Sequence, residues 1–277
     1  MKSYTYYNGE FARTEDIRIP LSDRAIYFGD GIYDAAIGKH GKIFLLDEHI
    51  KRFISNAKRL GFSPIPTYRD LSVLLTDTVS RAAFDEYFVY FQISRSAEER
   101  IHSSLGCNTT NLMITVNKFS VKNDDSPISL ITYPDNRHHY CDIKTINLLP
   151  SVLASTAAEE AGCDEAVFHR GPTVTECAHS NISILKSGIL YTHPLSELIL
   201  PGITRRHLLT ACESLGIPYR EHAFTVDDLY AADEVLVTST SKLCRCAASI
   251  NGRPVGGKDR RKSTDLRNFL YREYENL

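Results

Sequence analysis

A polar stretch near the middle of the chain constrains the fold most. Residues 118–127 include Asn123-Asp124-Asp125-Ser126-Pro127, a run of residues that favour turns. On each side of it, short apolar strands alternate with segments of helical spacing. A length of 277 residues suits two domains. The pattern predicts an α/β (or α+β) protein with an N-terminal domain at 1–117, a linker at 118–127, a C-terminal domain at 128–277, and a cleft between the domains.

Local patterns place the individual elements. Asp47 is the predicted N-cap of a helix that Gly61 ends. The apolar residues that share one face of this helix are Ile50, Phe53, Ile54, Ala57 and Leu60. Further helices are expected at about 69–83, 150–161, 205–215 and 265–275. Strands are expected at about 4–7, 42–45, 87–94, 111–117, 128–133, 165–169, 182–185, 189–192 and 235–237, with one more around Lys144.

Lys144 stands out because branched apolar residues, rather than other charges, flank it in the segment 141–149. An apolar wall penalises the charged ammonium and favours a lysine that loses its proton near neutral pH. Such a lysine can form a Schiff base with a carbonyl cofactor. An edge strand with one solvated lysine is the other interpretation, and the segment alone leaves both open.

Glu176 lies downstream in the segment 173–182, among threonine, serine and asparagine side chains with β-forming residues on both sides. A carboxylate fixed there could accept a proton from a heterocyclic nitrogen. Pyridoxal phosphate needs a lysine at its aldehyde carbon and an acid at its ring nitrogen. Taken alone, a glutamate in such a segment is more commonly an ordinary loop carboxylate.

Two further segments suit a phosphate group. Residues 200–204 lead into the helix that Gly216 ends, and the free amides at a helix start bind anions. The apolar run that begins at Val235 ends in four hydroxyl side chains, Thr238-Ser239-Thr240-Ser241. Hydroxyls at a strand end are common in turns, but four of them after a predicted anion site favour a phosphate site.

In this order and at this spacing, the segments resemble the class IV (fold-type IV) pyridoxal-phosphate-dependent aminotransferases, most closely the D-amino-acid aminotransferases of that family. The runs 28–33 and 48–52 match as well, and the resemblance extends from about Tyr6 to about Gly252. It implies a two-domain fold-type IV enzyme with its active site in the interdomain cleft.

The resemblance also implies residue roles. Lys144 is the catalytic residue, which carries the Schiff base and then moves the proton between the substrate Cα and the cofactor. Glu176 pairs with the ring nitrogen of pyridoxal 5′-phosphate. The residues implied to hold the phosphate are Arg52, Ile203, Thr204 and Thr240.

Substrate binding is implied for three residues. Arg100 and His102 resemble the carboxylate trap of D-amino-acid aminotransferases, which reaches into the neighbouring subunit and works with the tyrosine matching Tyr33. A homodimer is therefore expected. The implied reaction, of EC 2.6.1 type, transfers an amino group from a D-amino acid (D-Ala, D-Glu or D-Asp type) to a 2-oxo acid such as 2-oxoglutarate or pyruvate.

Alternatives share the same cofactor motifs. A branched-chain L-amino-acid aminotransferase and an aminodeoxychorismate lyase have this fold, and a non-catalytic binding protein could retain it.

Departures from the family pattern bear on the choice of substrate. His179 stands where D-specific enzymes have small residues, and it could enter the pocket or be structural. Lys242 and Arg245 could meet a side-chain carboxylate of the substrate or face water.

Charge and composition narrow the function classes. The net charge of −2 does not indicate a protein that binds nucleic acid or membrane surfaces. No apolar run approaches the ~18 residues of a membrane-spanning helix, and the N-terminus lacks a signal-peptide core. Seven cysteines without zinc spacing predict reduced thiols in a cytoplasmic protein and no metal site.

Overall fold

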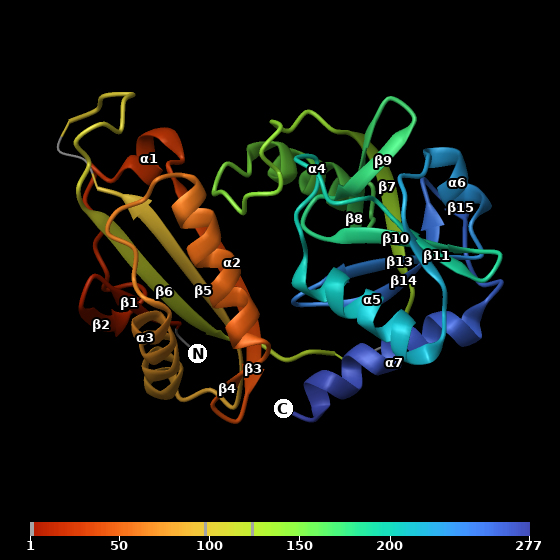
Figure 1. Ribbon diagram of the computed structural model, residues 1–277, viewed down its shortest axis with the longest axis horizontal. Coiled ribbons are helices and arrows are strands. Elements are labelled where there is room, and N and C mark those ends of the chain that lie inside the picture. The colour runs from red at the N-terminus through yellow and green to blue at the C-terminus, as the bar shows by residue number, and fades with distance from the viewer. Residues whose placement is uncertain (1–2, 97–98, 123–124) are drawn as a thin grey trace. The chain divides into compact units, whose positions relative to one another are not determined.

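The computed structural model describes residues 3–96, 99–122 and 125–277, which form two compact units (Figure 1). The first unit comprises the chain up to Val121, the segment Ile143–Asn147 and Leu277. The second comprises Lys122–Asp142 and Leu148–Asn276. Residues 123–124 of the predicted linker lie outside the described residues. Each unit is built around a sheet of its own, so the mixed α/β class expected from the sequence is confirmed.

The first unit contains a six-stranded antiparallel sheet in the order β2-β1-β6-β5-β3-β4. Its strands are β1 (Tyr4–Tyr7), β2 (Glu10–Arg13), β3 (Gly31–Lys39), β4 (Lys42–Ile43), β5 (Glu86–Arg95) and β6 (Thr110–Lys118). Its helices are α1 (Arg24–Phe28), α2 (Leu46–Arg59) and α3 (Tyr68–Ala82). Helix α2 packs against β3 and α3 against β6, so both helices bury their apolar faces on the sheet (Figure 1).

The start of α2 differs from the prediction. The N-cap is Leu45, in the left-handed region at φ 53°, and it makes no side-chain cap. Asp47 lies in the first turn, where its negative charge is still favourable to the helix dipole. The apolar stripe is as predicted, with Ile50, Phe53 and Ala57 buried in the core. Packing of that stripe, rather than the cap, therefore fixes where the helix begins.

The second unit contains a nine-stranded mixed sheet in the order β12-β11-β10-β13-β14-β7-β8-β9, with β15 paired to β14. Its strands are β7 (Ile128–Pro134), β8 (Glu165–Arg170), β9 (Thr173–Cys177), β10 (Asn181–Lys186), β11 (Ile189–Thr192), β12 (Tyr219–Glu221), β13 (Glu234–Ser239), β14 (Leu243–Ile250) and β15 (Arg253–Pro254). Its helices are α4 (Leu149–Glu160), α5 (Ile203–Leu215), α6 (Val226–Ala231) and α7 (Arg260–Glu275). Helices α5 and α7 pack on each other and on the central strands β13 and β14 (Figure 1).

The segment around Lys144 was predicted as a strand within the C-terminal part of the chain. It forms only one isolated bridge, between Ile32 and Thr145. Ile143 is buried in the core of the first unit, and the backbone N–H of Tyr33 donates to the carbonyl of Lys144 at 2.9 Å. These contacts join the segment Ile143–Asn147 to strand β3 of the first unit.

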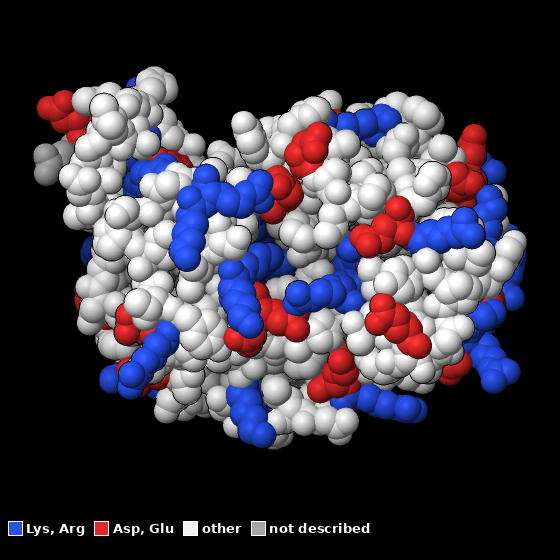
Figure 2. Space-filling model, in the orientation of Figure 1, with Lys and Arg blue, Asp and Glu red and all other residues white. Residues whose placement is uncertain are grey.

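Basic and acidic side chains both occur across the visible surface (Figure 2). Within residues 3–96, 99–122 and 125–277, no helix is long and apolar enough to cross a membrane. The same described ranges contain no cluster of three or more histidine, cysteine or carboxylate side chains suited to a metal ion.

Candidate active site

Lys144 lies beside Tyr33 of the first unit. Its Nζ atom is 4.3 Å from the centre of the Tyr33 ring, within the range of a cation–π contact. Tyr33, on β3, stacks on Tyr90, on β5, with ring centres 5.2 Å apart. Strand pairing thus positions an aromatic platform, and the short segment that carries Lys144 runs along its edge. Two of the predicted site residues, Lys144 and Tyr33, are therefore neighbours.

Arg52 is held by a buried carboxylate. Its Nε and one terminal nitrogen donate to the two oxygens of Asp34, each at 2.8 Å, in a bidentate pair. Asp34 lies on β3 and is fully buried, whereas Arg52 and His49 project from one face of α2 at a spacing of three residues. Strand β3 and helix α2 together fix the orientation of the Arg52 guanidinium.

His49 completes this cluster, because its Nδ1 lies 2.8 Å from Asp34. Burial alone would raise the pKa of Asp34, but the charges and hydrogen bonds of Arg52 and His49 outweigh it and hold that pKa well below its usual range. Burial lowers the pKa of His49, with Asp34 opposing the shift. A neutral His49 must carry its proton on Nδ1, since the carboxylate only accepts.

Arg100 and His102 lie on an exposed loop of the first unit. The guanidinium of Arg100 is 5.2 Å from the centre of the Phe28 ring, and the His102 ring is 5.1 Å from the same ring. Among the described residues, no hydrogen bond or ion pair joins either side chain to Tyr33 or Lys144. The predicted substrate residues thus form two separate groups within this unit.

Arg24 anchors that loop, and no sequence pattern pointed to it. Its guanidinium donates to the carbonyl oxygens of Ile101 at 2.5 Å and His102 at 2.9 Å. Its Nε donates to Asp30 at 2.7 Å, and Arg24 is itself buried. A buried guanidinium that satisfies main-chain carbonyls fixes the path of the loop.

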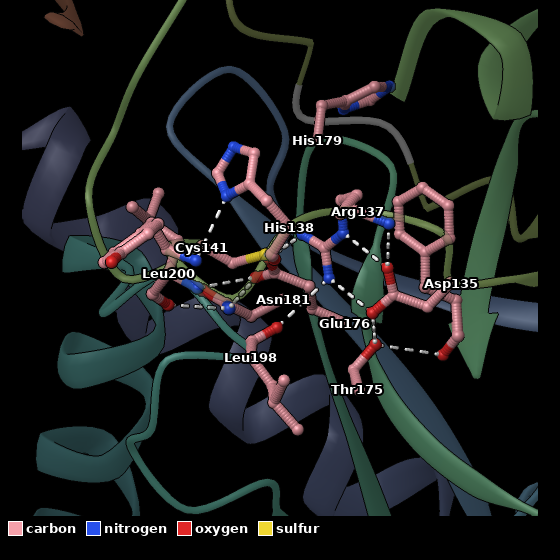
Figure 3. Close-up of polar contacts among 12 residues, drawn as sticks. Asp135, Arg137, His138, Cys141, Thr175, Glu176, His179, Asn181, Leu198 and Leu200 are labelled. Atoms are coloured by element: carbon pink, nitrogen blue, oxygen red, sulfur yellow. Dashed lines mark hydrogen bonds and ion pairs between the residues drawn. The ribbon is translucent and has the colours of Figure 1, made fainter. Parts of the chain in front are cut away.

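Glu176 is the best-fixed carboxylate of the second unit (Figure 3). It lies at the end of β9 and is buried. The amide of Asn181 donates to its Oε2 at 2.9 Å, the backbone N–H of Leu200 donates to the same oxygen at 3.0 Å, and Arg137 donates to its Oε1. Three donors from three parts of the chain favour the ionised form and fix its orientation.

Arg137 is in turn held by Asp135, and sequence patterns did not single out either residue. Arg137 donates to both oxygens of Asp135, at 2.9 and 3.0 Å (Figure 3). Its guanidinium also lies over the Phe168 ring, 4.5 Å from the ring centre. Burial would raise the pKa of Asp135, but hydrogen bonds and charge from Arg137 lower it to about 2. The only sequence signal was a carboxylate at the end of a strand, which is common in turns.

The start of α5 lies at the segment that the sequence predicts to bind an anion. Gly202 is the N-cap and provides no side chain to cap the first amides, while Ile203 and Thr204 are buried there. A Cβ at position 202 would collide with Oδ1 of Asn181, so only glycine fits. Asn181 therefore touches both Glu176 and the entry to this helix, since its amide also donates to the Leu200 carbonyl at 3.0 Å.

Thr240 is the first residue of the three-residue connection between β13 and β14, whose flanking residues Ser239 and Leu243 pair with each other. Strand β13 runs next to β10, and Thr238 is the register partner of Asn181. The hydroxyl-bearing end of β13 thus lies beside the strand that supports Glu176. Within the second unit, Asn181 therefore links Glu176 to the entry of α5 and lies opposite Thr238, two residues before Thr240.

The three departures from the family pattern have structural partners. Lys242 pairs with the buried Glu165 at 2.9 Å, and Arg245 donates to the Ser126 carbonyl at 2.5 Å. His179 is half-exposed, with its Nδ1 3.2 Å from Glu165. The ammonium of Lys242 is thus engaged by a protein carboxylate, which is neither of the two interpretations left open for it.

Known proteins resemble this chain over most of its length. It is 36% identical over 253 residues to a D-alanine aminotransferase of Staphylococcus aureus (strain MSSA476), covering 90% of each chain. It is 35% identical over 254 residues to a D-alanine aminotransferase of Bacillus licheniformis, covering 90% of this chain and 89% of the relative.

Solved structures share the fold. A branched-chain aminotransferase from the archaeon Thermoproteus uzoniensis superposes with a TM-score of 0.89 at 23% identity, over 100% of this chain and 97% of the other. The fold-type IV architecture expected from the sequence is confirmed. The family model for amino-transferase class IV matches residues 31–250, which include Lys144, Glu176 and the start of α5. The chain belongs to the class IV aminotransferases.

Proposed function

We propose that this aminotransferase transfers an amino group from a D-amino acid, of the D-Ala, D-Glu or D-Asp type, to a 2-oxo acid such as 2-oxoglutarate or pyruvate. The observation that carries the chemistry is the Glu176 carboxylate, fixed by Asn181, Leu200 and Arg137. The similarity to D-alanine aminotransferases supports the choice of substrate.

The side chains present fit pyridoxal 5′-phosphate as the cofactor. When bound, it supplies an aldehyde for the amino group and an electron-withdrawing ring next to the substrate Cα. The buried, triply held Glu176 suits a ring nitrogen, and the uncapped start of α5 suits a phosphate. Arg52, Ile203, Thr204 and Thr240 hold that phosphate in this proposal.

Lys144 has two tasks in the proposed reaction. Its amine would hold the cofactor at the aldehyde carbon. When free of that bond, the same amine would accept the proton of the substrate Cα and later give it back, so one group would act as base and then as acid. Tyr33, whose ring contacts the Lys144 ammonium, faces the substrate in this proposal.

A homodimer completes the proposed site. Arg100 and His102 bind the substrate α-carboxylate in the neighbouring subunit, together with the Tyr33 of that subunit. Their exposure, and that of two apolar side chains on the same loop, support this role: Ile101 is 55% exposed and Leu105 95%. Helix α4 also exposes Leu149, Val152 and Leu153, which a second copy could cover. A cytoplasmic location stays a prediction from the cysteine content.

A panel of D- and L-amino acids with 2-oxoglutarate tests the reaction. We expect the oxo acids of D-Ala, D-Glu or D-Asp to appear, with D-Ala ahead of L-Leu and L-Val. Turnover of L-Leu and L-Val alone would establish the branched-chain alternative. Pyruvate released from aminodeoxychorismate without an amino acceptor would establish the lyase. A colourless, inactive protein after incubation with pyridoxal 5′-phosphate would refute all three enzyme assignments.

Arg100→Ala tests the carboxylate trap. We expect KM for the D-amino acid to rise by roughly tenfold or more, because a charge-assisted pair to the carboxylate is lost, while cofactor affinity is unchanged. Arg59→Ala, on the exposed end of α2, is the control for loss of a surface guanidinium. An unchanged KM in Arg100→Ala would place the carboxylate elsewhere.

A further inference from the structure

We propose that Glu165 and Lys242 are positioning residues that fix the turn carrying Thr240 to the turn that follows Glu176. This inference rests on the proposed role of Thr240 in phosphate binding. Glu165 lies at the first position of β8 and is buried, with its side chain fully covered. A buried carboxylate of this kind persists only when charge and hydrogen bonds compensate it.

Glu165 has partners from both turns. Lys242, the last residue of the β13–β14 connection, donates to Oε2 at 2.9 Å. Ser180 donates from its hydroxyl to the same oxygen at 3.0 Å, and the backbone N–H of His179 donates to Oε1 at 3.1 Å. One carboxylate thus ties the turn at 178–180 to the turn at 240–242, although the two are about sixty residues apart in sequence.

The turn that carries Thr240 needs such a tie. Leu243, which follows Lys242, has φ 51°, in the left-handed region that glycine adopts more easily. Leu243 is the first residue of β14, directly after the three-residue connection. Leucine carries a conformational cost that surrounding contacts must offset. The Glu165–Lys242 pair and a hydrogen bond from the Tyr271 hydroxyl to the Lys242 carbonyl, at 3.3 Å, hold this conformation.

His179 lies on the outer side of the cluster. Its ring is half-exposed, with Nδ1 3.2 Å from Glu165 and 3.3 Å from the Ser180 hydroxyl. Lys242, with 25% of its side chain exposed, is the more covered of the two basic side chains on Glu165. Loss of Lys242 should therefore disturb the buried carboxylate more than loss of the His179 ring.

Lys242→Met tests the tie, because it removes the ammonium but keeps the aliphatic stem. We expect the apparent Kd of the apoenzyme for pyridoxal 5′-phosphate to rise roughly tenfold, which corresponds to about 1.4 kcal/mol. Equilibrium titration of cofactor absorbance measures it without turnover. Lys186→Met is the matched control, since Lys186 pairs with Asp228 at 2.8 Å on the more exposed end of β10.

Two further variants separate positioning from general stability. Lys242→Arg, which keeps the charge, should restore most of the cofactor affinity. In Glu165→Gln/Lys242→Met, the second change should cost less than it does alone, because no buried charge is left unpaired. A Kd within about twofold of wild type in Lys242→Met, or a fall in Tm with no change in Kd, would overturn the proposal. If the wild-type protein itself bound no cofactor, the proposed function would fail instead.

Discussion

The two units use the same kind of buried pair for opposite purposes. In the first, the carboxylate of Asp34 is the support, and the guanidinium of Arg52 is the group proposed to act on the phosphate. In the second, the guanidinium of Arg137 is the support, and the carboxylate of Glu176 is the group proposed to act on the ring nitrogen. Each acting group is a charge fixed by an opposite charge on another element.

The difference lies in how the acting charge is balanced. Asp34 is shared by one cation and by His49, whose pKa burial lowers, so the cluster remains compact and close to neutral. Arg137 instead bridges two carboxylates, Glu176 and Asp135, and gains a further contact with Phe168. Glu176 also has two uncharged donors, Asn181 and Leu200. Glu176, the anion proposed to lie beside a ring nitrogen, thus combines one charged donor with two uncharged ones.

Lys144→Ala should have the largest effect, because neither cluster can replace its amine. We expect transamination of D-Ala to fall by roughly 10⁴-fold or more. Borohydride reduction of the wild-type protein followed by peptide mapping should place the cofactor on Lys144. Lys51→Ala, at an exposed lysine of the same unit, is the control. Retained turnover in Lys144→Ala, or a label on another amine, would remove Lys144 from its role.

Arg137→Met should have the next largest effect, because it leaves two buried carboxylates without their shared cation. Glu176 then loses a charged donor that fixes its carboxylate, so we expect kcat/KM to fall on the order of 100-fold. Arg170→Met is the control, since Arg170 also donates to Asp135, at 3.2 Å, but has no bond to Glu176. Equal losses in the two variants would show that the Arg137–Glu176 contact is not what matters.

Asp34→Asn should disturb the cluster of Asp34, Arg52 and His49 in the first unit. It should change the affinity for the cofactor more than the turnover. The amide keeps one acceptor for Arg52 but loses the charge and the second acceptor, so we expect the Kd for pyridoxal 5′-phosphate to rise roughly tenfold. Turnover at saturating cofactor should change less. Asp47→Asn, in an exposed pair with Lys51, provides the control. A loss of turnover without a change in cofactor affinity would contradict the assignment of Arg52 to the phosphate.

The smallest expected effect is a loss of folding stability in acid that depends on Asp135. Its pKa falls from an ordinary 3.8 to about 2 in the folded protein, so its ionised form stabilises the fold above about pH 4. This contribution is lost as the pH falls from about 4 to about 2, and it amounts to about 1 kcal/mol after allowance for screening. Urea unfolding between about pH 5 and about pH 3 should show a shallower loss of stability in Asp135→Asn. Parallel curves would refute the coupling.

Local sequence patterns were enough to predict the elements in which buried residues recur at a regular spacing. The apolar stripe of α2 and the alternation of β5 identify both elements without their partners. The strand expected around Lys144 was wrong, because that segment makes a single bridge to β3 and is placed by tertiary packing of Ile143. The N-cap at Asp47 was wrong for a similar reason.

Local sequence patterns could not identify the residues that support the site. Arg137 meets Glu176 from 39 residues away, Arg24 meets Ile101 from 77, and Lys242 meets Glu165 from 77. No spacing rule links residues so far apart, because the fold itself creates the contact. Lys144 and Glu176 could be singled out since their own neighbours in sequence carry the signal, whereas a supporting arginine looks like any other.

The hydrogen bonds of Arg24 to the main chain have a consequence for amino-acid substitutions at neighbouring positions. It binds the main-chain oxygens of Ile101 and His102, which every amino acid possesses, and not their side chains. Substitutions at 100 and 102 therefore leave the anchor intact. Given the proposed role of these two positions in substrate binding, a library at 100 and 102 could change substrate preference while the hydrogen bonds of Arg24 to the main chain are kept.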